Sequence, residues 1–239
     1  MTRPATLPAA LIVAHGQPSD PEPAEAEIAA LAAKVQALMP GWHVRSATLA
    51  MEGALAARVA EAGPRGLVYP LFMAGGWFTR INLPAKLAEA GGHGWRVLPP
   101  FGEDPAVQDL AVTLAREAVA ATGTDPRDAA VLLAAHGSFR STAPADVAAR
   151  MAWKLWAEAG IGHVVPAFID QQPQIATVAA GMPAGAIVLP FFAARGGHVI
   201  DDLPEALEEA GFAGTVLPPL GLDPRVPRLI AAALRGAPG

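Results

Sequence analysis

The sequence contains an internal repeat, and this repeat constrains the fold more than any other feature. The segment ALIVAHGQPSDPEPAE near the start corresponds to VLLAAHGSFRSTAPAD in the middle, and VLPPFGEDPAV corresponds to VLPPLGLDPRV. Between them, GLVYPLFMAGGWFTRINLPAKLAEAG corresponds to AIVLPFFAARGGHVIDDLPEALEEAG. Three blocks in the same order and at nearly one offset indicate a duplicated structural unit. We therefore expect two halves, residues 1–122 and 129–239, joined by the turn-rich segment ATGTDPRD.

Each half alternates short apolar runs with amphipathic stretches. Runs that are apolar almost throughout are typical of parallel strands covered by helices on both faces. Between the runs, apolar residues such as Ile28, Leu31 and Val35 recur at helical spacing. This order predicts an α/β fold of two tandem repeats, each a parallel four-stranded sheet flanked by helices. The expected strands are Ala10–Ala14, His43–Leu49, Gly66–Phe72 and Arg96–Pro99, then Ala130–Ala135, His163–Ile169, Ala186–Phe192 and Thr215–Pro218.

Composition excludes several classes of function. Hydrophobic residues make up 52% of the 239 residues, which is enough for a substantial core and argues against disorder. The net charge of −5 and the lack of a basic run leave no electrostatic footprint for nucleic acid. There are no cysteines, so disulfides, thiolate metal sites and a cysteine nucleophile are excluded. No apolar run is long enough for a membrane span, and the N-terminal run lacks a convincing signal-peptide cleavage region, so we expect a cytoplasmic protein.

Two histidines of the second half are predicted to meet at one edge of its sheet. Ligands of open α/β sheets bind beyond the carboxyl ends of the strands. His136 follows the first strand of this half, and His198 follows the third strand after a Gly-Gly pair. Two imidazoles at one edge can share a cobalt, nickel, iron or zinc ion, although a His-Gly after a strand also serves as an ordinary turn. Asp170, at the end of the second strand, is a candidate third ligand or equally a solvated loop acid.

The first half keeps only part of this arrangement. His15 corresponds to His136, but Phe78 stands where the second half has His198, so the first half cannot build the same site alone. Trp77 and Phe78 follow a Gly-Gly pair in a loop, where they could form a wall against a flat ligand or pack into the core. Three arginines near these loops could pair with carboxylates or remain solvated, namely Arg80, Arg140 and Arg195.

These motifs together resemble those of the CbiX-type sirohydrochlorin chelatases, within the class II chelatase superfamily. The resemblance is carried by AHGS at Ala135–Ser138, by VLPFFAARGGHVIDDLP at Val188–Pro204, and by their degenerate copies in the first half. It covers essentially the whole chain and implies a fused two-repeat member that holds a macrocycle in the cleft between its halves.

The resemblance also implies roles for individual residues. His136 and His198 match the paired metal-binding and catalytic histidines of the family, and Asp170 occupies a place where the family often has a glutamate. The residues expected to bind the tetrapyrrole are His15, Trp77, Phe78, Arg80, Ser138, Arg140 and Arg195.

The function implied by the resemblance is metal insertion into sirohydrochlorin or a related tetrapyrrole. We expect Co²⁺ for cobalamin biosynthesis first and Fe²⁺ for sirohaem second, with Ni²⁺ as a further alternative and no organic cofactor. A neutral imidazole can accept a pyrrole proton near neutral pH. The sequence does not fix the oligomeric state, but it is compatible with a monomer, because a fused pair needs no dimer to form its cleft. The alternatives are a non-catalytic tetrapyrrole or metal carrier and a periplasmic solute-binding protein, against which the missing signal peptide counts.

Overall fold

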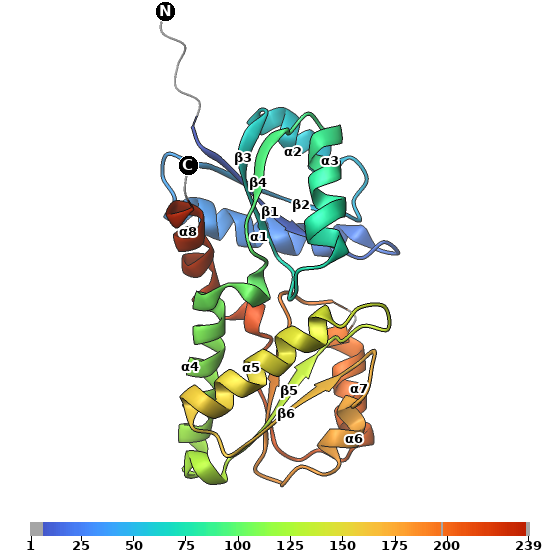
Figure 1. Cartoon of the computed structure of the whole chain (residues 1–239), viewed down its shortest axis with the longest axis vertical. Helices are drawn as coiled ribbons and strands as arrows, with labels where there is room; N and C mark the ends of the chain where they lie inside the picture. Colours follow the sequence, from blue (N-terminus) through green and yellow to red (C-terminus); the bar gives the residue numbers. More distant parts are fainter. Residues whose placement is uncertain (1–6, 197, 238–239) are drawn as a thin grey trace, which may run out of the picture. The chain divides into compact units, whose positions relative to one another are not determined.

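The chain folds into two compact units, each built around its own parallel sheet (Figure 1). The computed structural model describes residues 7–196 and 198–237, and the side chain of His198 lies outside the described part. One unit comprises the chain up to Phe101 together with residues from Pro224 onward, and the other comprises Gly102–Asp223. The predicted α/β architecture with two four-stranded sheets is confirmed.

The first unit has the strand order β2-β1-β3-β4, with all neighbours parallel. Its strands are β1 (Ala9–Ala14), β2 (His43–Thr48), β3 (Arg65–Pro70) and β4 (Gly94–Val97). They are connected by the helices α1 (Pro21–Leu38), α2 (Ala54–Ala62) and α3 (Leu83–Glu89).

The core of the first unit follows from the alternation of side chains along β1. Leu11 and Val13 pack in one cluster with Leu55 of α2 and Leu87 of α3. Because successive strand residues point to opposite faces, Ile12 faces the other layer, and it is fully buried. Both faces of the sheet are therefore covered, which explains the continuous apolar runs in the sequence.

The second unit repeats this topology, with the parallel order β6-β5-β7-β8. Its strands are β5 (Ala130–Ala135), β6 (His163–Phe168), β7 (Ile187–Pro190) and β8 (Thr215–Val216). Its connecting helices are α5 (Ala143–Ala159), α6 (Ile175–Ala179) and α7 (Leu203–Glu209). Leu132 and Ala134 of β5 pack with Leu203 and Leu207 of α7, as their counterparts in β1 pack with α3.

The last helix of each sequence half belongs to the unit formed by the other half. Helix α4 (Pro105–Thr122) ends the first half but packs against α5 and β7. Helix α8 (Val226–Gly236) ends the second half but packs against α1 and β3. Figure 1 shows α4 beside α5, and α8 beside α1. The compact units therefore differ from the predicted sequence halves, 1–122 and 129–239, by an exchange of these helices.

One π-helix follows β3 in the first unit and another follows β7 in the second, and the sequence patterns did not predict them. They are η1 (Phe78–Asn82), directly before α3, and η4 (His198–Asp202), directly before α7. A π-helical turn holds one residue more than an α-helical turn, and such turns often occur at functional sites. None of the described helices is long and apolar enough to cross a lipid bilayer.

Candidate functional site

The carboxyl end of β5 carries His136, whose imidazole is held by the backbone that follows it. Nδ1 of the ring lies 3.0 Å from the carbonyl oxygen of Gly137. A carbonyl oxygen only accepts hydrogen bonds, so Nδ1 is the donor and the lone pair of the neutral ring lies on Nε2. The side chain is 42% exposed, so the ring is accessible from solvent.

Asp170 lies beside the same ring, because strand β6 ends next to β5. The backbone N–H of Asp170 donates to the carbonyl oxygen of His136 at 2.9 Å. Its carboxylate oxygen Oδ2 lies 3.4 Å from Nδ1 of His136. The structure therefore brings together these two predicted site residues, with the carboxylate on the Nδ1 side of the imidazole.

A glutamine that the sequence analysis did not select fixes the loop after His136. Oε1 of Gln171 accepts a hydrogen bond from the backbone N–H of Ser138 at 2.9 Å. Gly137, which lies between His136 and Ser138 in the sequence, has a φ of 76°, and a Cβ there would lie 2.6 Å from Cγ of Gln171. Only glycine adopts this conformation and allows this approach at low cost. The sequence offered one indication of this role, because Gln171 directly follows Asp170 at a strand end.

His198 is the first residue of η4, and its predicted contact with His136 concerns a side chain outside the described part. The backbone places His198 after β7, which is paired directly with β5. The carboxyl ends of parallel neighbours meet at one edge of a sheet. Among the side chains that the structure describes, which leave out His198, no group of three or more His, Cys, Asp or Glu could hold a metal ion.

The first unit repeats the histidine geometry, but with Ala50 at the position of Asp170 and Phe78 at the position of His198. Nδ1 of His15 lies 3.0 Å from the carbonyl oxygen of Gly16, as in the second unit. The backbone N–H that donates to the carbonyl oxygen of His15 belongs to Ala50, which carries no carboxylate. Phe78, the first residue of η1, makes a T-shaped contact with the His15 ring at a centroid distance of 4.6 Å. An aromatic ring thus occupies the neighbourhood of this histidine.

Large apolar side chains are exposed at the carboxyl ends of the strands in each unit. Nine such side chains are exposed among the described residues, and five of them follow β3, β5 or β7. Trp77 is 60% exposed and makes a T-shaped contact with Phe78, which also stacks on Phe72. Phe139, directly after Ser138, is 82% exposed. The five are Trp77, Phe78, Ile81, Phe139 and Ile200, of which the sequence analysis selected only the first two.

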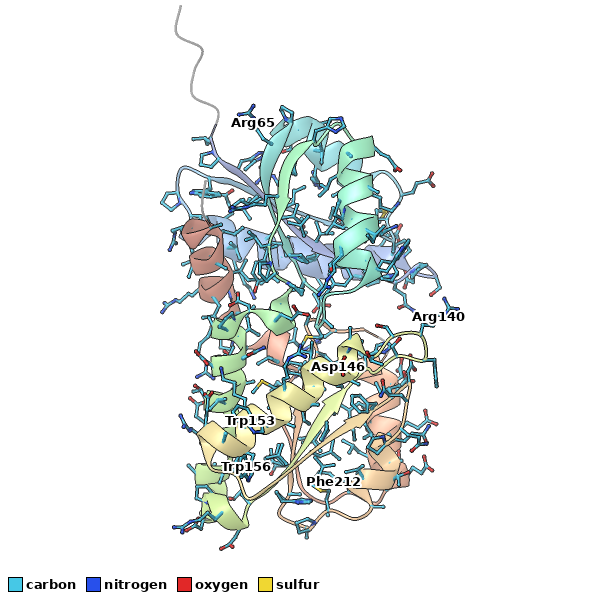
Figure 2. All side chains as sticks on the ribbon, viewed as in Figure 1. Arg65, Arg140, Asp146, Trp153, Trp156 and Phe212 are labelled. Carbon is cyan, nitrogen blue, oxygen red and sulfur yellow. The ribbon has the colours of Figure 1, made fainter. Side chains whose placement is uncertain are left out.

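The three predicted arginines are all exposed and lie in the segments that follow the strands. Arg80 lies in η1, Arg195 follows β7, and Arg140 lies in the loop between β5 and α5 (Figure 2). The backbone N–H of Arg140 donates to Oγ of Ser138 at 3.1 Å, which orders the start of this loop. Guanidinium groups form strong bidentate contacts with carboxylates, so residues of this type at these positions suit a ligand that carries carboxylates.

The opposite end of the first sheet carries a separate ionic cluster. Nε2 of His43 lies 3.2 Å from Oε1 of Glu61, and the guanidinium groups of Arg45 and Arg58 contact the same carboxylate. Burial alone would raise the pKa of Glu61, but the hydrogen bond from Arg58 and the positive charges of Arg45, His43 and Arg58 outweigh it, so this pKa is lowered. This cluster lies at the start of β2 and is separate from the carboxyl ends of the strands, where His15 is found.

A family model and a solved structure of a CbiX both match nearly the whole chain, and the solved structure has high sequence identity. The family model for CbiX matches it twice, over residues 9–118 and 130–237. The CbiX described as the terminal enzyme for biosynthesis of siroheme in denitrifying bacteria is 48% identical, with a TM-score of 0.88. That match covers 97% of this chain and 100% of the other.

More distant structures share the fold. SirB from Bacillus subtilis with Fe³⁺ is 17% identical, with a TM-score of 0.73, over 95% of this chain and 94% of that chain. The sirohydrochlorin chelatase SirB from Bacillus subtilis subspecies spizizenii in complex with cobalt is 18% identical, with a TM-score of 0.67, over 95% and 93%. At these identities the likeness concerns the fold alone. A search of curated proteins gave no match.

Proposed function

The chain belongs to the CbiX family, and from this premise we propose that it inserts a divalent metal ion into sirohydrochlorin or a closely related tetrapyrrole. The observation that carries the proposal is the edge of the second sheet, where the fixed imidazole of His136 lies beside Asp170. His198 begins the π-helix that follows the neighbouring strand. We propose His136 and His198 as the catalytic and metal-binding pair, with Asp170 as the acidic member of the site.

We propose Fe²⁺ as the metal substrate, with Co²⁺, the first expectation from sequence, as the alternative. The relative that is 48% identical over its full length is named as an enzyme of siroheme biosynthesis, and siroheme is the iron complex of sirohydrochlorin. Affinity is a poor guide here, because imidazole ligands bind cobalt, nickel and zinc as well as iron. Selection between iron and cobalt therefore has to be measured as a rate of insertion.

Metal insertion requires the protein to deliver a cation and to remove two pyrrole protons from the macrocycle. The hydrogen-bonded Nδ1 of His136 leaves the lone pair on Nε2, which can bind a metal ion or accept a proton. A site that must release its metal needs few protein ligands and open coordination positions. Two imidazoles and no thiolate satisfy that requirement, because the chain contains no cysteine.

The apolar and basic residues of the site edges are proposed to bind the macrocycle. Exposed aromatic side chains such as Trp77 and Phe78 match the flat apolar face of a tetrapyrrole. His15 is proposed to support this surface, because its ring already contacts Phe78. The groups proposed to bind the carboxylates of the macrocycle are Ser138, Arg80, Arg140 and Arg195.

The test is an absorbance assay with sirohydrochlorin and Fe²⁺, Co²⁺, Ni²⁺ or Zn²⁺ in turn, without oxygen. We expect multiple turnovers, fastest with Fe²⁺. His136→Ala and His198→Ala should each lower kcat/KM at least about 100-fold, whereas His15→Ala should have a smaller effect. His163→Ala is the matched control, because His163 lies at the opposite end of its sheet.

Two outcomes would contradict the proposal. Full activity in the double variant of His136 and His198 would remove these residues from the mechanism. Formation of no more than one metallated product per chain would identify a carrier of the tetrapyrrole or metal instead of an enzyme.

A further inference from the structure

We propose that Asp170 is a positioning residue, which acts on the metal through the imidazole of His136 and is not itself a ligand. This inference rests on the proposed function, because it takes His136 as the residue that binds the incoming ion. It changes the role expected from sequence, where Asp170 was a candidate third ligand. The observation that supports it is that the carboxylate of Asp170 lies on the Nδ1 side of the His136 imidazole.

Nδ1 of His136 is the nitrogen that both neighbours approach. The carbonyl oxygen of Gly137 lies 3.0 Å away and Oδ2 of Asp170 lies 3.4 Å away. Since Nδ1 carries the proton, the nitrogen that can bind a metal ion is Nε2, on the far side of the ring. A carboxylate beside the N–H of a metal-binding imidazole fixes the orientation of the ring and raises its basicity as a ligand.

The backbone explains why the carboxylate reaches that nitrogen. The N–H of Asp170 donates to the carbonyl oxygen of His136 at 2.9 Å, so the two residues lie side by side at adjacent strand ends. The aspartate side chain is short and ends next to Nδ1, in contact with the proton-bearing side of the ring. The carboxylate is 33% exposed, so it lies at this position without being buried.

The first unit provides an internal comparison. His15 has the same contact between Nδ1 and the following carbonyl oxygen, at the same 3.0 Å. It also has the same backbone hydrogen bond from the neighbouring strand end, at 2.8 Å, but from Ala50. The backbone geometry is therefore common to both units, and two features distinguish His136 from His15: the carboxylate beside Nδ1, and a histidine instead of Phe78 at the start of the following π-helix. We assign to Asp170 the part of this difference that acts through Nδ1 of His136.

The experiment is a double-mutant cycle on Co²⁺ affinity, measured by titration calorimetry on the full chain without tetrapyrrole. Asp170→Ala should weaken Co²⁺ binding about 10-fold or more in the wild-type background. In the His136→Ala background the same change should alter the affinity less than about 2-fold, because the ring through which Asp170 acts is gone. Equal losses in the two backgrounds would overturn the proposal, because a direct ligand acts without His136.

Two conservative variants give a second discrimination. Asp170→Asn keeps an oxygen acceptor beside Nδ1 and should retain most of the affinity that Asp170→Ala loses. Asp170→Glu moves the carboxylate one methylene further and should bind Co²⁺ more weakly than Asp170→Asn. The reverse order would overturn the proposal, since a charged carboxylate is the better direct ligand. Asp125→Asn is the control, because Asp125 is an exposed carboxylate that accepts a backbone hydrogen bond before β5.

The cycle separates this inference from the proposed function. A wild-type chain that binds Co²⁺ but never metallates sirohydrochlorin refutes the proposed function, and the affinity cycle still decides the role of Asp170. A chain that metallates sirohydrochlorin with equal Co²⁺ affinity in all Asp170 variants retains the function and refutes the inference.

Discussion

The geometry of Gly137, directly after His136, allows a specific prediction about the loop that follows β5. Gly137 has a φ of 76°, and an added Cβ would lie 2.6 Å from Cγ of Gln171 and 3.0 Å from Cβ of Phe168. The left-handed conformation costs a residue with a side chain about 1–2 kcal/mol, and overpacking adds about 1–3 kcal/mol. We therefore expect Gly137→Ala to lower the free energy of unfolding by about 2–5 kcal/mol.

The same substitution should also weaken metal binding. An alanine at this position displaces Gln171, whose side chain accepts the hydrogen bond from the N–H of Ser138. The carbonyl oxygen that holds Nδ1 of His136 belongs to Gly137 itself, so the ring loses its fixed orientation. We expect a loss of Co²⁺ affinity of roughly 10-fold, the lower end of what supporting contacts of a metal ligand contribute.

Variants at two other glycines distinguish the cost of the left-handed backbone conformation from the cost of overpacking. Gly123 has a φ of 72° with nothing within 4 Å of an added Cβ, so Gly123→Ala should cost only about 1–2 kcal/mol. Gly16, with a φ of 77°, would meet Cβ of Thr48 at 2.7 Å. Gly16→Ala should therefore match Gly137→Ala in lost stability while leaving Co²⁺ affinity unchanged.

The assay is urea unfolding of the three variants, followed by calorimetric titration with Co²⁺. Equal losses of stability in Gly137→Ala and Gly123→Ala would refute the packing argument, because only the backbone conformation would then matter. Unchanged Co²⁺ affinity in Gly137→Ala would refute the claim that this loop orients His136.

Three further predictions concern stability. Glu61→Gln should lower the free energy of unfolding by roughly 0.2–1 kcal/mol at neutral pH. Because the pKa of Glu61 is lowered in the folded state, its contribution to the free energy of unfolding is present above the unfolded pKa and is lost as the pH falls through the folded pKa. A loss of stability in Glu61→Gln that persisted in acid would contradict this. Glu52→Gln is the control. Arg235→Ala should cost about 0.5–1.5 kcal/mol, because Nη2 of Arg235 donates to the carbonyl oxygen of Leu38 at 2.8 Å; an equal loss in Arg228→Ala, on the exposed side of α8, would argue against this. Ending the chain at Asp223 removes Val226, Ile230 and Leu234, each fully buried and each contributing about 1.5–3 kcal/mol, so limited proteolysis should digest the first unit while the second resists.

The repeat and the apolar runs were sufficient to predict both sheets. Hydrophobic pattern located β1 and β5 to within a residue, since strands covered on both faces need apolar side chains throughout. The runs at β3 and β7 extended past the observed ends at Pro70 and Pro190, because the apolar residues that follow pack against the core after strand pairing has stopped. Periodicity could not distinguish a π-helical turn from the start of α3 or α7.

The site was predictable in its residues but not in its contacts. The position of His136 at a strand end could be derived from the order of strands. The side of its ring that Asp170 approaches depends on rotamers and on strand register, which no sequence spacing records. The exposure of Phe139 and Ile200 was missed for a similar reason, since an apolar residue in a loop is as easily assigned to the core.

The exchange of α4 and α8 has a consequence for a polypeptide cut between its repeats. A protease that cleaved at 123–125 would produce one fragment with β1–β4 and α4, and another with β5–β8 and α8. Each fragment would still supply a helix to the fold of the other, so neither could leave without unfolding part of both. Such a nicked molecule would remain interlocked, and two separately produced fragments would have to associate before either sheet had its full covering of helices.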